Sequence, residues 1–386
     1  MDKVTKRAQP APPVPSAIPA VTPEGVPWVR ILVWLLATRV LIAMMAGFSS
    51  LIIPAGADMG NPHNLWEAFL RWDTGWFMSV VERGYFFDPA RGSNVAFMPL
   101  YPALVWIFSL GRLIEPRVVG VLLSNVALFY GCAALWRIAM RRWNSTETAG
   151  LSVALVLFGP VSFFLSIFYS EALFFCAVAA CLDEAERERW AIAGLWGMAA
   201  ALTRNSGFIL VLPLLIYFLL PWKRPRKWRQ ILWLGLPVLG SAAFTLYLWF
   251  AFGDAQLYAK AQRFWGRELA WPWIAFQNGF HNNSIPLFFR IYFHGAAGLA
   301  AAMLVLAVVV RARLSWVVLM IIWPLLYVST LLLHSLPRYL TTVVPYYLVA
   351  AAAAQRWPIV RYPLLLWSAM MLMLSVILFV NGYWFV

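Results

Sequence analysis

The chain has 386 residues, of which 62% are hydrophobic and 12% are charged, and its formal net charge is +14 at pH 7. An ordinary soluble domain carries about 25% charged residues, so this composition excludes a water-soluble protein. Long apolar runs recur along the whole length without strand-like alternation, which predicts an all-α protein that crosses the membrane many times. The positive charge lies in short loops between these runs, where it indicates membrane topology and argues against nucleic-acid binding.

The first 27 residues are predicted to form a disordered cytoplasmic tail. They contain Lys3, Lys6 and Arg7, followed by a stretch rich in proline and alanine. The apolar run behind this tail is too long for the hydrophobic region of a cleavable signal peptide. Residues 28–386 are predicted to form a single transmembrane domain.

About eleven spans are predicted when the loops rich in lysine and arginine are placed in the cytoplasm. Two large loops, residues 54–117 and 253–286, then lie on the extracytoplasmic side. An apolar segment at 99–113 is short for a crossing and contains two prolines, so it is predicted to lie in the membrane interface. The predicted span boundaries fall near residues 28, 53, 118, 140, 149, 169, 190, 205, 223, 252, 287, 311, 334, 356 and 386.

The most informative charged residue of the chain is Asp73, in the first outer loop. If this loop is helical, a carboxylate lies within an apolar stripe, which is costly and more typical of function than of stability. A partly dry pocket raises the pKa of a carboxyl group, so Asp73 is predicted to be a general base. The alternative is an interfacial carboxylate paired with Arg71 or Arg83. The apolar positions three, four, seven or eight residues away are Trp66, Phe69, Leu70, Trp76, Phe77, Val80 and Val81.

Other polar residues on the same predicted side are candidates for substrate binding. Glu82 could contact an acceptor or form a surface ion pair with Arg83. Arginines at membrane depth are usually paired or anion-binding, and a guanidinium suits phosphate. Arg263 lies in a stretch where Lys260 and Arg267 alternate with tryptophans. Snorkelling arginines and an aromatic belt are the alternatives. The candidates are Arg71, Trp72, Glu82, Arg204, Asn205, Arg263, His334, Arg338 and Tyr339.

Motifs for soluble cofactors are missing from the sequence. It contains no glycine-rich phosphate loop, HExxH motif or dinucleotide fingerprint, which argues against a soluble nucleotide-sugar donor. The four histidines are scattered, and the three cysteines fall in apolar runs. No cofactor and no metal ligands are therefore predicted, and the residues give a divalent-metal requirement no support.

Four segments between residues 30 and 350 resemble, in order and spacing, the GPI mannosyltransferase 2 family. That family contains the enzyme that adds the second mannose of the GPI anchor, together with prokaryotic relatives. The most specific blocks are Trp72-Asp73 and the run from Phe97 to Pro102. The segments are RWDTGWFMSVVERGY, AFMPLYPALVW, ALTRNSGFILVLPLL and HSLPRYLTTVVPYYL, which begin at residues 71, 96, 201 and 334.

The resemblance implies a GT-C glycosyltransferase fold, a lipid-linked sugar donor and catalysis on the extracytoplasmic face. In such enzymes an acidic residue of the first outer loop is the base, which corresponds here to Asp73. Met98 stands where a second phenylalanine is frequent, and the chain looks shorter than the eukaryotic members. A prokaryotic relative in a bacterial plasma membrane is therefore expected, with the acceptor left open.

These observations together predict an inverting glycosyltransferase that moves a hexose, expected to be mannose, from a polyprenyl-phosphate donor to a hydroxyl group of a glycan or lipid. Arg338 would contact the donor phosphate, with Arg204 and Arg263 as further candidates. The alternative is a transporter or flippase for a lipid-linked saccharide, in which the same groups only bind. The absence of an evident internal repeat and the gathering of polar groups on one side favour the enzyme.

Overall fold

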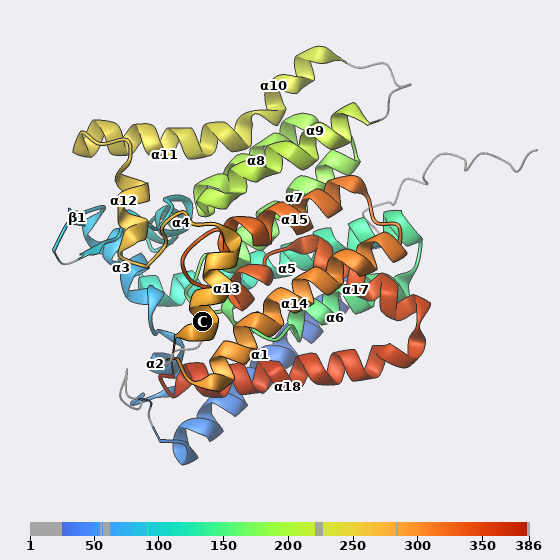
Figure 1. The fold of residues 1–386 in the computed structure, drawn as a ribbon, viewed down its shortest axis with the longest axis horizontal. Coiled ribbons are helices and arrows are strands. Elements are labelled where there is room, and N and C mark those ends of the chain that lie inside the picture. Colours follow the sequence, from blue (N-terminus) through green and yellow to red (C-terminus); the bar gives the residue numbers. More distant parts are fainter. Residues whose placement is uncertain are drawn as a thin grey trace, which may run out of the picture.

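Helices form nearly all the regular structure of the chain (Figure 1). The computed structural model describes residues 25–54, 56, 62–90, 92–220, 227–282 and 285–383. Most of the predicted tail lies outside the described residues, as do the predicted span boundaries at 223 and 386. Within the described residues the exception is one short antiparallel hairpin, β1 (Phe87–Asp88) and β2 (Gly92–Ser93). The predicted all-α class is confirmed.

Longer helices build the body of the molecule, and shorter helices and 3-10 turns connect them. The longer helices are α1 (Trp28–Ile52), α5 (Pro116–Trp143), α6 (Thr146–Leu157), α7 (Glu171–Glu186), α8 (Trp190–Thr203), α11 (Leu236–Phe252), α14 (Leu287–Val309), α15 (Leu314–Val328), α17 (Val344–Arg356) and α18 (Arg361–Val380). The shorter elements are α2 (Leu65–Phe69), α3 (Asp73–Arg83), α4 (Leu100–Phe108), η2 (Ser162–Leu165), η3 (Asn205–Leu210), α9 (Val211–Leu219), η4 (Trp228–Gln230), α10 (Ile231–Leu234), α12 (Leu257–Arg263), α13 (Pro272–His281), α16 (Leu336–Leu340) and η5 (Pro358–Val360).

Four helices of the described chain are long and apolar enough to cross a membrane, namely α1, α5, α14 and the segment Pro358–Val380 that contains α18. A fifth candidate span is the pair Trp228–Leu234 and Leu236–Phe252, whose helices are bent by 43°. These helices make the chain an integral membrane protein. The helices α6, α8, α15 and the segment Asn205–Leu219 are apolar but have only 10–17 residues. The predicted number of about eleven spans is therefore not confirmed.

The predicted third span, residues 149–169, shows why apolar runs and helices differ in length. α6 ends at Leu157, just before Pro160, because proline lacks an N–H and disfavours a helical residue before it. Arg39 of α1 donates a hydrogen bond to the carbonyl of Leu157, at the end of α6, at 3.3 Å. The same guanidinium contacts the hydroxyl of Ser166. An arginine in an apolar helix thus supplies a hydrogen-bond donor to a backbone carbonyl where the neighbouring helix ends.

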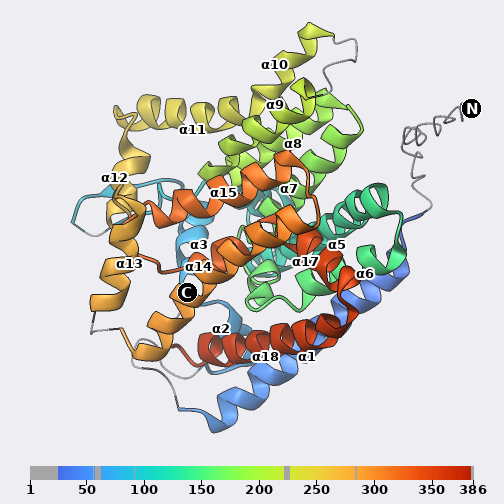
Figure 2. The same ribbon diagram turned by 45° about the vertical axis from the view of Figure 1, so that its right-hand side comes forward.

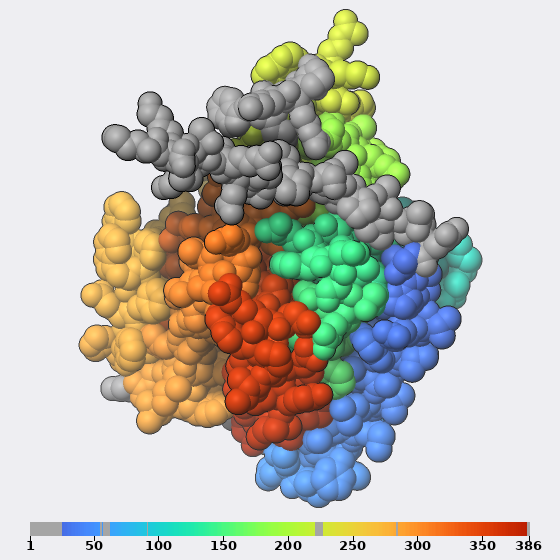
Figure 3. Space-filling view, turned by 90° about the vertical axis from the view of Figure 1, so that its right-hand side faces the viewer, coloured from blue at the N-terminus to red at the C-terminus, as the bar shows by residue number. Residues whose placement is uncertain are grey.

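Three of the predicted cytoplasmic loops, those that follow α5, α14 and α17, lie together at one end of the described chain. Arg142, at the end of α5, donates to the carbonyl of Arg311, between α14 and α15, at 2.8 Å. Arg361, at the start of α18, pairs with Glu147 in the first turn of α6. Figure 3 looks onto this end, where the blue, green and red segments lie side by side.

The opposite end carries the short helices of the two predicted outer loops. The helices α2, α3, α12 and α13 lie in the left half of Figure 1 and remain there in Figure 2. α4, within the segment 99–113 that was predicted to lie in the interface, has nine residues and is too short to cross a membrane. This end holds the polar residues that the sequence analysis selected.

Candidate active site

Asp73 is the first residue of α3 and follows an irregular turn. From the sequence, residues 66–81 are predicted to lie on one helix. In the structure α2 ends at Phe69, and Trp72 has a φ of 57°, in the left-handed region that bulky residues rarely adopt. The assumption of one continuous helix was therefore wrong. Asp73 thus stands at the N-terminus of α3.

The turn before Asp73 is held by Tyr169, which lies just before α7. The Tyr169 hydroxyl donates to the carbonyl of Arg71 at 2.9 Å and accepts from the backbone N–H of Asp73 at 3.1 Å. These two backbone groups lose their helical partners where the chain turns, so the phenol satisfies both of them. Tyr169 is buried and was not selected from the sequence.

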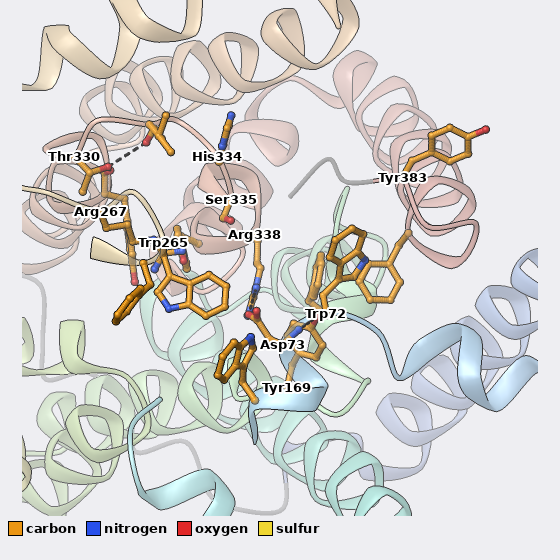
Figure 4. A pocket seen from close by; sticks show the side chains of 17 residues that line it. Trp72, Asp73, Tyr169, Trp265, Arg267, Thr330, His334, Ser335, Arg338 and Tyr383 are labelled. Atoms are coloured by element: carbon orange, nitrogen blue, oxygen red, sulfur yellow. Dashed lines mark hydrogen bonds and ion pairs between the residues drawn. The ribbon is translucent and has the colours of Figure 1, made fainter. Parts of the chain in front are cut away.

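The Asp73 side chain pairs with Arg338 of α16 (Figure 4). The guanidinium Nη1 lies 2.6 Å from Oδ2 of Asp73, and the two side chains are 8% and 19% exposed. The alternative partners considered from the sequence were Arg71 and Arg83, whereas the structure pairs Asp73 with a residue 265 positions along the chain. A charge-assisted contact of this kind fixes the position of the carboxylate.

A second carboxylate, Glu171, stands behind this pair and was missed by the sequence analysis. It is fully buried as the first residue of α7. Its Oε1 contacts Nε of Arg338 and lies 2.5 Å from Nη1 of Arg204. The signal in the sequence was a lone acidic residue that opens the apolar run ALFFCAVAACL, since ionisable residues in such runs are rare and usually paired.

Two cavities adjoin at the pair of Asp73 and Arg338. Their volumes are about 340 Å³ and about 640 Å³. The smaller cavity extends between Trp72 and aromatic rings that include Phe164. The larger cavity extends along the polar segment 203–206. Both cavities are lined by Asp73, Trp265, Arg267, Tyr327, Arg338 and Tyr339.

Tyr339 lies close to two arginines in this shared wall. Its ring stacks on Tyr327 with centroids 3.9 Å apart and an interplanar angle of 8°. The guanidinium carbons of Arg204 and Arg267 each lie 4.9 Å from the centroid of the Tyr339 ring. Such distances allow cation–π attraction between each guanidinium and the ring.

The other predicted binding residues divide into those at the cavities and those away from them. Asn205 lines the larger cavity, and His334 lines the smaller one. Burial lowers the pKa of His334 to about 4, so this imidazole is neutral at pH 7. Arg71 is buried and Glu82 is exposed, and neither lines these two cavities.

Arg263 lies at the edge of the larger cavity, where its side chain is 70% exposed. Its guanidinium Nε is 3.8 Å from Oε1 of Glu268, which is 55% exposed. An exposed pair at this distance is weak. The neighbouring Arg267, which the sequence analysis did not select, lies deeper and lines both cavities.

Carboxylates at this site pair with arginines, as the contacts of Asp73 and Glu171 show. Across the described ranges no group of three or more His, Cys, Asp or Glu side chains is arranged to hold a metal ion. The site therefore contains a fixed carboxylate, several guanidiniums and two adjoining cavities that are both lined by this carboxylate.

Comparison with known proteins gives one family and two similar folds. The chain resembles the structure of ArnT from Cupriavidus metallidurans bound to undecaprenyl phosphate, with 16% identity over 83% of this chain and 60% of that one, at a TM-score of 0.45. It also resembles the apo oligosaccharyltransferase of Archaeoglobus fulgidus, with 12% identity over 90% of this chain and 55% of that one, at a TM-score of 0.48. The chain thus spans less than two thirds of the length of either protein.

No curated protein sequence matches the chain. Residues 29–277, which run from within α1 into α13 and include the Asp73 turn, match the family model described as mannosyltransferase (PIG-V). Because this match covers well over half of the sequence, the chain belongs to the mannosyltransferase (PIG-V) family.

Proposed function

We propose that the protein is an inverting glycosyltransferase that moves a hexose, expected to be mannose, from a polyprenyl-phosphate donor to a hydroxyl group of a glycan or lipid. Family membership supports the reaction class. The observation that carries the proposal is the position of Asp73, which is fixed by Arg338 at the junction of two cavities. A transferase must bring two substrates to one base, and two cavities that share a carboxylate meet this need.

In the proposed reaction the acceptor oxygen attacks the anomeric carbon of the donor sugar. The bond from that carbon to the phosphate oxygen breaks, and its electron pair leaves with polyprenyl phosphate. The acceptor proton passes to Asp73, whose Oδ2 contacts Arg338 while Oδ1 has no hydrogen-bond partner among the described residues. Phosphate is a good leaving group, so no separate general acid is required. A single displacement inverts the anomeric configuration.

This proposal is tested by assaying the purified full-length protein in detergent, with a labelled polyprenyl-phosphate mannose and an acceptor extract. We expect sugar transfer without any sealed vesicle, and a product whose anomeric configuration is opposite to that of the donor. The product linkage is read by NMR. Retention of configuration would contradict a single displacement. Activity that requires a sealed vesicle and moves the lipid without cleaving it would favour the transporter or flippase instead.

We further propose that the active end faces the extracytoplasmic side of a bacterial plasma membrane, with the N-terminus in the cytoplasm. The arginine-rich loops at the opposite end support this orientation, because positive loops stay in the cytoplasm. Donor and acceptor would then meet at the outer surface.

Cysteine labelling tests the orientation, because the three native cysteines are buried. Arg117 is exposed at the start of α5, and Arg356 is exposed at the end of α17, beside the arginine-rich loops. We expect a cysteine introduced by Arg117→Cys to react with an impermeant maleimide added to intact cells. The cysteine introduced by Arg356→Cys should react only after permeabilisation. The reverse pattern would contradict the orientation.

A further inference from the structure

Charges at the junction of the two cavities do not cancel. Arg204 and Arg338 contact Glu171, and Arg338 also contacts Asp73 at 2.6 Å. Two carboxylates thus balance two guanidiniums. Arg267 lines both cavities and adds a third guanidinium, so one positive charge remains. An uncompensated charge in a partly buried site is costly unless a ligand supplies the opposite charge.

The Arg267 side chain makes no hydrogen bond and no ion pair within the part of the chain that the structure describes. Its contact with Tyr339 is a cation–π contact, at 4.9 Å from the ring centroid. A cation–π contact does not consume hydrogen-bond donors, so the guanidinium N–H groups stay available to a ligand. Glu268, the adjacent acid, is directed to Arg263 instead.

Local backbone geometry fixes Arg267 in this position. Gly266 has a φ of 64°, a conformation that L side chains rarely adopt, and a Cβ there would come within 2.8 Å of Leu332. The N–H of Arg267 also donates to the carbonyl of Gln262 at 3.1 Å. Figure 4 shows the side chain in the cavity wall near Trp265 and Thr330. The turn therefore directs a guanidinium into the cavity.

Burial lowers the pKa of Arg267, and the charges of Arg204 and Arg338 act in the same direction. Asp73 opposes this shift, although it already contacts Arg338. A bound anion would compensate the Arg267 charge in the same way as a carboxylate.

We infer that Arg267 binds the phosphate of the lipid-linked donor, and of the lipid phosphate left after transfer, while Arg204 and Arg338 hold the two carboxylates. This inference rests on the proposed function and moves the phosphate contact from Arg338 to Arg267. A sugar phosphodiester carries one negative charge, which matches the one positive charge that remains. Guanidinium groups bind phosphate oxygens through paired N–H donors, and those of Arg267 are not used by other residues of the described chain.

Binding of a prenyl phosphate to the purified full-length protein in detergent tests this inference without requiring turnover. The probe is farnesyl phosphate, titrated by calorimetry, and farnesol is the uncharged comparison. We expect Arg267→Gln to weaken farnesyl phosphate binding by at least about tenfold, or ~1.4 kcal/mol, because a charge-assisted contact is lost. Farnesol binding should not change. The matched control is Arg117→Gln, which removes one exposed charge at the same end and should bind as the wild type does.

Equal binding of farnesyl phosphate by the wild type and by Arg267→Gln would overturn the role of Arg267. So would a loss that is just as large for farnesol, since that would reflect packing against Tyr339 and not recognition of charge. Failure of the proposed function gives a different result. In that case the wild type would transfer no sugar in the detergent assay, whether or not it binds farnesyl phosphate.

Discussion

Replacing Glu171 by glutamine is expected to destabilise the protein and to abolish most of its activity. The change leaves Arg204 and Arg338 close together in a buried site without the carboxylate between them. Removing one partner of a buried ion pair typically costs about 3–5 kcal/mol. Asp73 would also lose the support of a fixed Arg338, so sugar transfer should fall together with stability. Thermal unfolding and turnover in detergent measure the two effects.

Two further variants separate charge balance from simple damage to α7. Glu184→Gln makes the same change in the same helix, at a residue whose partner Arg189 is 55% exposed, and should alter stability by less than about 1 kcal/mol. Combining Glu171→Gln with Arg204→Gln restores the charge balance and should recover part of the lost stability. If Glu171→Gln unfolds at the wild-type temperature, the buried cluster does not hold Arg338 in place.

Charged residues in an apolar chain are the part of this site that the sequence could predict. Asp73, Arg204 and Arg338 were selected because an ion at membrane depth needs a partner or a function. The structure brings these three residues together around two cavities. These residues could be selected because burying a charge is costly in any fold, so the details of this fold were not needed.

Pairing partners could not be predicted in the same way. Asp73 meets Arg338 across 265 positions, and Glu171 meets it across 167. Helical periodicity relates only residues within a few turns, and the interfacial alternative named only the nearby arginines Arg71 and Arg83. Tyr169 was missed for the same reason, because its hydroxyl serves the backbone of a distant turn.

The number of spans was the least predictable feature of the fold. Hydropathy marks where a chain is apolar, but proline interrupts helices inside such runs, as Pro160 does after α6. The bend between α10 and α11 divides another apolar run, with Pro237 in the first turn of α11. Several predicted spans are consequently short helices or broken ones, although three of the predicted cytoplasmic loops still lie together.

Asp73→Asn is expected to reduce sugar transfer by at least about a hundredfold. Asparagine has nearly the same shape, and its amide oxygen can still accept from Arg338, so the turn should keep its geometry. A neutral amide cannot take the proton from the acceptor hydroxyl, so the loss should appear in turnover at saturating donor. Asp254→Asn is the matched control, because Asp254 lies outside both cavities and an asparagine oxygen can still accept from the N–H of Gln256.

Turnover of purified, folded Asp73→Asn with labelled polyprenyl-phosphate mannose is the most direct test of the role of this carboxylate. Binding of farnesyl phosphate and the thermal unfolding temperature show whether the variant is folded. We predict near-normal lipid phosphate binding, turnover reduced at least about a hundredfold, and an Asp254→Asn control that transfers sugar as the wild type does. A folded Asp73→Asn protein that turns over at close to the wild-type rate would contradict the assignment of Asp73 as the base.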